Sequence, residues 1–214
     1  MLSKIQVRPG EHVAFMGMTG SGKTVLARHL LDSLKRVIVI DPKSEWFGKG
    51  WKRKMSLPSF DKEFRLVWAP KRSQDDKLAE LLHRAWKKKH LTIYVDELQS
   101  LTDFFPHATD ALTDIIRTGR SREVAVWIST QRPAWVPRWF LSESRHKFAF
   151  TLLDKADRQR AGDVIGDRAK DKVPIHNFLY HGVGMEEAEH LTLDLKRGKI
   201  IQIEPANSDK EGGE

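Results

Sequence analysis

Short hydrophobic runs alternate along this chain with longer stretches in which apolar residues recur every three or four positions. The short runs are rich in β-branched and aromatic residues and end at glycine, proline or charged residues, which is typical of buried strands. The first of them is His12-Val13-Ala14-Phe15-Met16. We expect strands at residues 12–16, 36–41, 64–68, 91–97, 124–130 and 146–152, with shorter ones at 191–193 and 199–203.

The longer stretches predict amphipathic helices at residues 25–31, 75–89, 108–118 and 154–164. In the second of these, Leu78, Leu81 and Leu82 share one face, and three lysines close the helix where cations offset its dipole. Strands that alternate with helices predict an α/β fold, with a mainly parallel central sheet and helices on both faces. No repeat or long linker interrupts the pattern. We therefore expect a single domain over residues 1–204 and a polar, disordered tail over 205–214.

A glycine-rich segment, Gly17-Met18-Thr19-Gly20-Ser21-Gly22-Lys23-Thr24, follows the first expected strand and fits the pattern Gly-x-x-x-x-Gly-Lys-Ser/Thr. Glycines adopt backbone angles that a Cβ forbids, so successive N–H groups can point at phosphate oxygens near the start of the next helix. Lys23 then reaches the β- and γ-phosphates, and the Thr24 hydroxyl is a ligand for Mg²⁺. A strand before and a helix after favour this phosphate loop over a chance match. The residues expected to hold the nucleotide are Gly17, Thr19, Gly20, Ser21, Gly22, Lys23, Thr24 and Val25.

The expected strand at residues 91–97 ends in two acids, Asp96 and Glu97, as a Walker B segment does. In open α/β sheets, ligands bind at the carboxyl ends of the strands. Asp96 would hold Mg²⁺ through its water shell, and Glu97 would orient and deprotonate the attacking water. Two acids at a strand end can also be plain surface carboxylates. Downstream of a phosphate loop the first interpretation is favoured, because the loop requires such a partner.

Charge and composition narrow the class of protein. Thirty-seven Lys and Arg against 29 Asp and Glu give a net charge of +8, and the last eleven residues are acidic, so the rest is more basic still. A basic surface favours a polyanionic partner, although solvated lysine and arginine faces are common. The absence of cysteine excludes disulfides and cysteine-based zinc sites, and the nine histidines show no metal-ligand spacing. No apolar run approaches the roughly 20 residues of a membrane helix, and no signal peptide precedes the first strand. We therefore expect a soluble, cytoplasmic protein without membrane insertion.

Four segments in one order resemble the HerA–FtsK superfamily of DNA-pumping ATPases. They are the phosphate loop, Asp41-Pro42-Lys43 at a strand end, Asp96-Glu97 at another, and Gly119-Arg120-Ser121-Arg122 before the strand that ends Thr130-Gln131-Arg132-Pro133. The resemblance covers residues 11–166, and Gln131-Arg132-Pro133 is its specific part. It implies a RecA-like P-loop NTPase of the ASCE type that hydrolyses ATP with Mg²⁺ and moves double-stranded DNA as a homo-oligomeric ring, a pentamer or hexamer.

Within that superfamily, a chain of this length resembles the genome-packaging ATPases of double-stranded DNA viruses and phages. The resemblance then implies a capsid portal or membrane protein as docking partner, and a location in the host cytoplasm or at the procapsid or virion vertex. The residues after Gly166 are too few for the nuclease domain that large terminases carry.

The resemblance also assigns roles to single residues. Gln131 corresponds to the polar sensor between the γ-phosphate and the strand that moves upon hydrolysis. Arg120 is the first choice for the arginine that completes the site of the next subunit, with Arg117 and Arg122 as rivals. Such an arginine finger contributes roughly 10³–10⁵ in rate. The alternative for each arginine is a solvated or DNA-facing side chain.

Contacts of a DNA motor should go to phosphates through lysine and arginine, whatever the sequence. The first candidates are Lys49, Lys52, Arg53 and Lys54, in an aperiodic segment, 46–58, that we expect to loop out. The second choices are Arg132 and Arg138, after the sensor strand. Trp51 has two interpretations, a base-stacking platform or a packing residue.

Other functions stay open at the level of sequence. A cellular or plasmid DNA-transfer or segregation ATPase of the same superfamily would share these motifs. A nucleotide-switched DNA-binding or assembly protein would need ATP only as a conformational ligand, and Glu97 argues against it because a switch has little need of a base. A small-molecule phosphotransferase is less favoured, since no lid or acceptor pocket can be located.

Overall fold

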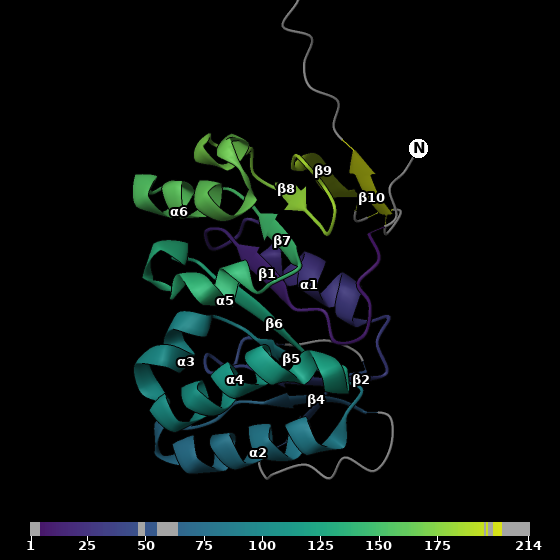
Figure 1. The fold of residues 1–214 in the computed structure, drawn as a ribbon, viewed down its shortest axis with the longest axis vertical. Helices are drawn as coiled ribbons and strands as arrows, with labels where there is room; N and C mark the ends of the chain where they lie inside the picture. The colour runs from purple at the N-terminus through teal and green to yellow at the C-terminus, as the bar shows by residue number, and fades with distance from the viewer. Residues whose placement is uncertain (1–4, 47–49, 55–63, 195, 197–198, 203–214) are drawn as a thin grey trace, which may run out of the picture.

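The strands of this protein form one mixed sheet in the order β10-β9-β8-β7-β1-β6-β5-β2-β4-β3 (Figure 1). A computed structural model describes residues 5–46, 50–54, 64–194, 196 and 199–202. The predicted tail at 205–214 lies outside these residues. That residues 1–204 form a single domain stays a prediction.

Seven neighbouring strands of the sheet run parallel, from β3 at one edge to β7. They are β1 (Val13–Met16), β2 (Arg36–Ile40), β3 (Lys52–Lys54), β4 (Phe64–Trp68), β5 (Leu91–Val95), β6 (Val124–Thr130) and β7 (His146–Ala149). The two central strands, β1 and β6, consist of buried residues throughout. This confirms the predicted α/β fold with a mainly parallel sheet.

The remaining three strands are antiparallel and extend the sheet beyond β7. They are β8 (Asn177–His181), β9 (Glu189–Asp194) and β10 (Lys199–Gln202). The sequence pattern predicts the cores of β9 and β10 but not β8. Phe178, Leu179 and Tyr180 are consecutive buried residues, and three apolar residues in a row show neither the strand period nor the helix period.

The helices cover the two faces of the sheet unequally. They are α1 (Lys23–Leu31), α2 (Asp75–Lys88), α3 (Leu98–Phe104), α4 (Pro106–Thr118), α5 (Arg138–Ser142) and α6 (Lys155–Ile165). Residues of α2 to α6 join one buried cluster with Ala14, Met16 and Ile38, whereas α1 packs on the other face with Val13 and Phe15 (Figure 1). Alternate residues of one strand thus enter opposite cores. Helices on both faces were predicted, but α3 and α5 were not.

The segment after β2 packs onto the face that α1 leaves open. Trp46 is only 2% exposed, and its ring lies 5.3 Å from the Trp51 ring and 5.1 Å from the Tyr94 ring. The guanidinium of Arg28 stacks on Trp46 from α1, at 4.8 Å. Within the described residues the expectation of a looped-out segment is therefore wrong, because the two indoles supply the apolar cover that one helix cannot. Trp51 acts here as a packing residue.

None of the helices in the described part of the chain combines the length and hydrophobicity that crossing a membrane requires.

Candidate functional site

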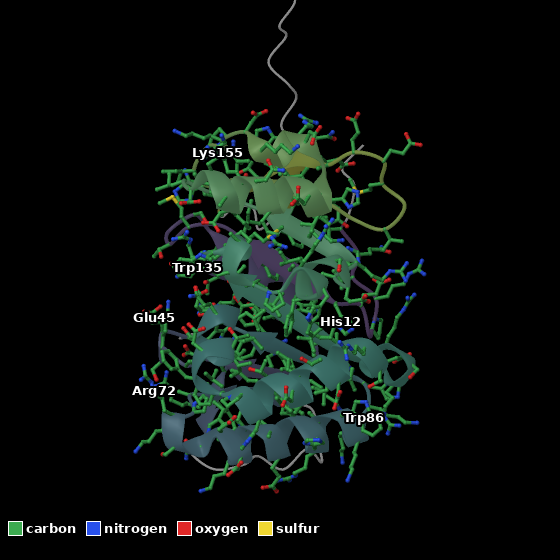
Figure 2. The ribbon with its side chains drawn as sticks, turned by 60° about the vertical axis from the view of Figure 1, so that its left-hand side comes forward. His12, Glu45, Arg72, Trp86, Trp135 and Lys155 are labelled. Carbon is green, nitrogen blue, oxygen red and sulfur yellow. The ribbon has the colours of Figure 1, made fainter. Side chains whose placement is uncertain are left out.

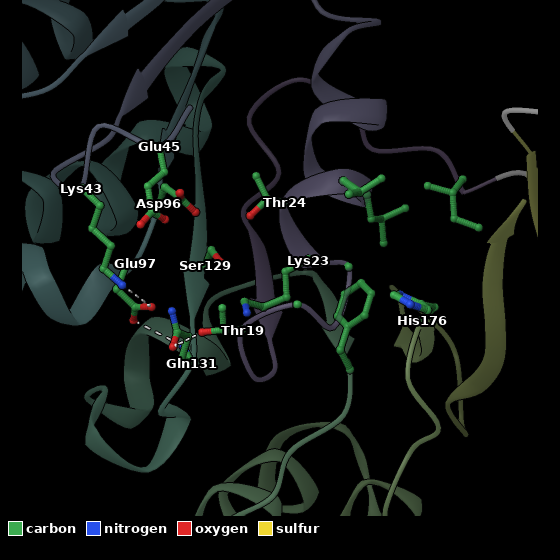
Figure 3. A pocket seen from close by; sticks show the side chains of 16 residues that line it. Thr19, Lys23, Thr24, Lys43, Glu45, Asp96, Glu97, Ser129, Gln131 and His176 are labelled. Atoms are coloured by element: carbon green, nitrogen blue, oxygen red, sulfur yellow. Dashed lines mark hydrogen bonds and ion pairs between the residues drawn. The ribbon is translucent and has the colours of Figure 1, made fainter. Parts of the chain in front are cut away.

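The carboxyl ends of the parallel strands meet at one edge of the sheet and enclose a cavity of about 330 Å³ (Figure 3). The loop after β1 forms its floor, and the residues after β5, β6 and β7 form its walls. One wall is polar and carries Asp96, Glu97 and Gln131; the opposite wall is largely apolar (Figure 3). The sequence predicted Lys23, Asp96, Glu97 and Gln131 as parts of one site, and the structure brings these four residues together.

Backbone hydrogen bonds connect the glycine-rich loop to residues near the ends of two strands. Gly17 N–H donates to Thr130 O at 3.1 Å, and Met18 N–H donates to Thr151 O at 2.8 Å. A Cβ on Gly17 would lie 2.6 Å from the Phe150 Cβ, so no other residue fits there. Gly20 and Gly22 have φ angles of 76° and 106°, which L side chains rarely adopt. The glycines of the motif are thus required by this fold of the loop.

The Lys23 side chain folds back over the loop. Its Nζ donates to the carbonyl oxygens of Gly17, at 2.6 Å, and Met18, at 2.8 Å. Burial lowers the pKa of the Lys23 ammonium to about 8, although the carboxylates of Asp96 and Glu97 act in the opposite direction. A buried cation that is held mainly by carbonyl oxygens suits an anionic ligand, which would stabilise its charge.

Thr24 and Asp96 lie on either side of a buried tyrosine hydroxyl. The Tyr94 Oη donates to Asp96 Oδ1 at 3.0 Å and also has hydrogen bonds with Thr24 and Ser129. Burial raises the pKa of the Asp96 carboxyl, and the neighbouring Asp41 and Glu97 add to this rise. Tyr94 thus contacts both residues predicted to bind a metal, a role that no sequence motif indicates.

Glu97 is held in an unusual backbone conformation. Its φ is 65° and its ψ 79°, a left-handed geometry that costs a non-glycine residue about 1–3 kcal/mol and is typical of functional sites. Its Oε1 accepts a hydrogen bond from Gln131 N–H at 3.3 Å, and its Oε2 lies 3.8 Å from Lys43 Nζ. The Gln131 amide oxygen in turn accepts from Thr19 Oγ1 at 2.7 Å. Lys43, Glu97, Gln131 and Thr19 therefore form one chain of contacts across the cavity (Figure 3).

Lys43 completes this chain, although the predicted site residues do not include it. It comes from Asp41-Pro42-Lys43, the second of the four segments that support the resemblance. Its side chain is partly exposed and lines the cavity, where its charge also lowers the pKa of Lys23. Two lysines that converge on one cavity favour a multiply charged anion.

The three arginines proposed as fingers lie at the opposite end of β6 from Gln131. Arg120 and Arg122 belong to the 3-10 helix η2 (Gly119–Arg122), directly before β6. Figure 2 places Trp86, on which Arg122 stacks at 4.2 Å, on the side of the molecule away from Glu45, which lines the cavity. None of the three can reach the cavity of its own chain.

The environments of these arginines differ. Arg122 Nε donates to Trp86 O at 2.9 Å, so its guanidinium is engaged within the chain. Arg117 stacks on the Trp139 ring at 5.2 Å. Arg120 is exposed, and its side chain has no hydrogen bond or ion pair among the residues described here. Of the three, Arg120 is therefore the most available to a second chain.

The residues proposed to contact DNA are scattered over several surfaces. Lys49 lies outside the described residues, and of Lys54 only the backbone is described. Lys52 is exposed on the edge strand β3. The neighbouring Arg53 contacts Ser44 O at 3.2 Å and Asp41 at 3.7 Å.

The second-choice arginines have partners of their own. Arg132 Nε lies 2.7 Å from the buried carboxylate of Asp157, and its guanidinium supports the exposed Trp135 ring at 4.2 Å. Arg138 donates to Asp163 O at 3.5 Å. Arg132 therefore anchors the segment after β6, whatever else it contacts.

The chain is similar to known proteins both in sequence and in structure. Residues 9–101 match the family model of the central domain of helicase HerA. The DNA packaging ATPase P9 of Enterobacteria phage PRD1 is 28% identical over 160 residues, which cover 70% of this chain and 67% of the phage protein.

Solved structures share the fold. The genome packaging NTPase B204 of Sulfolobus turreted icosahedral virus 2 superimposes with a TM-score of 0.68 at 18% identity, covering 86% of this chain and 97% of B204. The pCW3 conjugation coupling protein TcpA gives a TM-score of 0.60 at 16% identity, covering 85% of this chain and 59% of TcpA. The matches to the HerA central domain and to phage protein P9 agree with the four ordered motifs and support the resemblance to HerA–FtsK-like packaging ATPases, and the solved structures show that the chain shares the fold of these enzymes.

Proposed function

We propose that this protein hydrolyses ATP and couples hydrolysis to the movement of double-stranded DNA during viral genome packaging. The observation that carries the proposal is the convergence of Lys23, Asp96, Glu97 and Gln131 on one cavity. The order of the motifs along the chain, and the similarity of the chain to two viral packaging enzymes, support a role in genome packaging. A location in the host cytoplasm or at the procapsid vertex, with a portal or membrane protein as docking partner, belongs to the same proposal.

The phosphates of ATP would occupy the glycine-rich loop. Lys23 would exchange the carbonyl oxygens of Gly17 and Met18 for phosphate oxygens, and the loop N–H groups near the start of α1 would donate to the same anion. The exposed side chains of Thr19 and Lys43 lie at the end of the cavity where the γ-phosphate would bind. Lys23, Lys43 and the loop N–H groups would thus offset the negative charge of the phosphates.

The Thr24 hydroxyl and the Asp96 carboxylate fit Mg²⁺, because this ion prefers oxygen ligands and often takes only one or two from the protein. No cluster of three or more histidine, cysteine or acidic side chains that could hold a metal by itself occurs among the described residues. That suits an ion that arrives with the nucleotide. When bound, Mg²⁺ would neutralise phosphate charge and the carboxylate of Asp96, whose pKa burial raises.

Glu97 is placed to take a proton from the attacking water. Its two carboxylate oxygens are fixed separately, one by Gln131 N–H and the other by Lys43. The Gln131 side chain reaches Thr19 on the phosphate loop, so a change at the γ-phosphate is transmitted to the end of β6. Glu97 is then the general base and Gln131 the polar sensor of the site.

A ring of identical subunits explains the position of Arg120. In one chain, Arg120 and the cavity lie at opposite ends of β6, and the Arg120 side chain has no hydrogen bond or ion pair with the described residues. A neighbour packed against the cavity edge would bring its own Arg120 to the γ-phosphate. The finger would then stabilise transition-state charge in trans.

Double-stranded DNA should stimulate ATP turnover if hydrolysis drives translocation. We expect a several-fold rise in the steady-state rate at low salt, lost as ionic strength increases, because phosphate contacts release counterions. The measurement is phosphate release at high protein concentration, with and without linear duplex DNA. ATP turnover that is the same with and without DNA would leave a plain ATPase, and ATP binding without turnover would favour the nucleotide switch.

ATP affinity should fall at alkaline pH. In the free protein the Lys23 pKa is about 8, and bound phosphates raise it. Below pH 8 the ammonium is already charged, so this group leaves affinity unchanged. Above pH 8 binding must take up a proton, and affinity falls about tenfold per pH unit.

Titration calorimetry in two buffers of different ionisation enthalpy checks this expectation. Proton uptake should approach one per ATP by pH 9.5. A Lys23→Arg variant stays charged and should bind ATP without this pH dependence. Constant affinity of the unmodified protein between pH 8 and pH 9.5 would contradict the assigned role of Lys23.

A further inference from the structure

We propose that the apolar wall of the cavity is a nucleobase subsite that holds purine bases by contact and stacking and discriminates little between ATP and GTP. The subsite consists of Val25, Phe150, His176 and Leu193. The inference rests on the proposed function, since it names where the base of the bound nucleotide lies and which nucleotides the site accepts.

The antiparallel strands bring two of these residues to the cavity. β8 runs opposite to β7, so its first residues lie at the edge where β7 ends. β9 runs opposite to β8, and its last residues return to that same edge. Asn177 pairs with Thr192, and Thr192 Oγ1 donates to His176 O at 3.1 Å. His176 and Leu193 therefore stand beside the phosphate loop although they follow it by more than 150 positions.

The position of the γ-phosphate decides which wall receives the base. Glu97 and Gln131 mark the reacting end of the cavity, so the nucleoside must leave the loop on the other side. There, a Cβ on Gly22 would lie 3.5 Å from the Phe150 ring and 3.9 Å from His176 Nδ1. Val25, on the first turn of α1, is 46% exposed and lines the same cavity. The two rings and the valine thus border the exit from the loop.

The wall is built rigidly. The Phe150 ring packs against Phe178 at 5.1 Å, and its Cβ lies where a Gly17 side chain would be. His176 has a φ of 67°. Like Glu97, it is a non-glycine residue that lines the cavity and has a left-handed backbone conformation. Phe150 is only 2% exposed, so it backs the wall, whereas the exposed His176 ring and the partly exposed Val25 and Leu193 present the surface on which a base can lie.

The same wall carries little that could read the edge of a base. Among the described residues of the subsite, His176 is the polar side chain, and an imidazole can both donate and accept. Adenine and guanine differ in their exocyclic donors and acceptors. A site that forms a hydrogen bond with one group of a substrate discriminates against analogues without that group by a factor of about 10⁴–10⁵. An apolar pocket discriminates between similar substrates only weakly. We expect the dissociation constants of ATP and GTP to differ by less than about tenfold.

Binding of ATP, GTP and inorganic tripolyphosphate, each with Mg²⁺, tests the subsite. The variants are His176→Gly, which removes the ring and suits the positive φ, and Leu193→Ser; both positions lie near the surface, so the fold should be retained. Loss of base contact should weaken ATP and GTP about five- to hundredfold. Tripolyphosphate, which has no base, should bind each variant within twofold of the unmodified protein. Ile175→Ser, at an exposed neighbour outside the cavity, is the matched control.

The outcomes separate the two proposals. Variants that leave ATP affinity unchanged, or that weaken tripolyphosphate as much as ATP, overturn the placement of the base. A preference for ATP over GTP above a hundredfold overturns the lack of discrimination. An unmodified protein that binds neither ATP nor tripolyphosphate overturns the proposed function itself.

Discussion

Glu97→Gln should abolish ATP turnover and leave ATP binding within about threefold of the unmodified protein. Glutamine has nearly the same shape and keeps an oxygen for the Gln131 N–H, so the chain of contacts through Thr19 survives. It cannot accept the proton of the attacking water, and the contact with Lys43 loses its charge. General-base catalysis contributes typically 10²–10⁴, so a fall of this size is expected.

Single-turnover phosphate release and equilibrium ATP binding measure the two effects separately. The matched control is Glu123→Gln. Glu123 also has a left-handed backbone, with φ of 55°, but it lies before β6 at the opposite edge and contacts His90. A Glu97→Gln variant with more than a tenth of normal turnover would remove Glu97 from the role of base.

Arg120→Ala should lose about 10³–10⁵ in ATP turnover at concentrations at which the ring forms. ATP affinity of the isolated chain should be unchanged, because Arg120 lies at the far end of β6 from its own cavity. Arg120→Lys should recover only part of the rate, since a point charge replaces the planar fork that matches phosphate oxygens.

Arg117→Ala is the comparison for this effect. Arg117 is exposed on the last turn of α4 but stacks on Trp139, so its loss should cost little turnover. Equal rates for Arg120→Ala and the unmodified protein would disprove the finger. A large loss in Arg117→Ala alone would transfer the role to that residue.

The polar half of the site could be predicted from sequence because its residues follow closely on strands that all run in the same direction. β1, β5 and β6 are strands of buried residues, and in a parallel sheet their carboxyl ends share an edge. Lys23, Asp96 and Gln131 each lie within a few residues of such an end. Knowing the strands was therefore enough to bring Lys23 and Asp96 together, whereas Gln131 entered the predicted site through the family resemblance.

The rest depends on contacts that the sequence does not encode locally. His176 and Leu193 reach the cavity only because the chain reverses twice after β7, and β8 has no periodic pattern. Trp46 is buried because one helix leaves part of a face uncovered, a deficit visible only when the sheet is assembled. The three arginines look alike in sequence, and only their neighbours distinguish Arg120 from Arg122.

Mixing two inactive variants tests most directly whether the chain works as a ring with shared sites. Lys23→Ala lacks the phosphate-binding lysine but retains Arg120, and Arg120→Ala has the reverse defect. In the presence of duplex DNA, each variant alone should be silent. A mixture should recover part of the DNA-stimulated turnover, because an Arg120→Ala cavity then receives the arginine of a Lys23→Ala neighbour. A mixture that stays silent, when cross-linking shows mixed assemblies, would contradict the ring account.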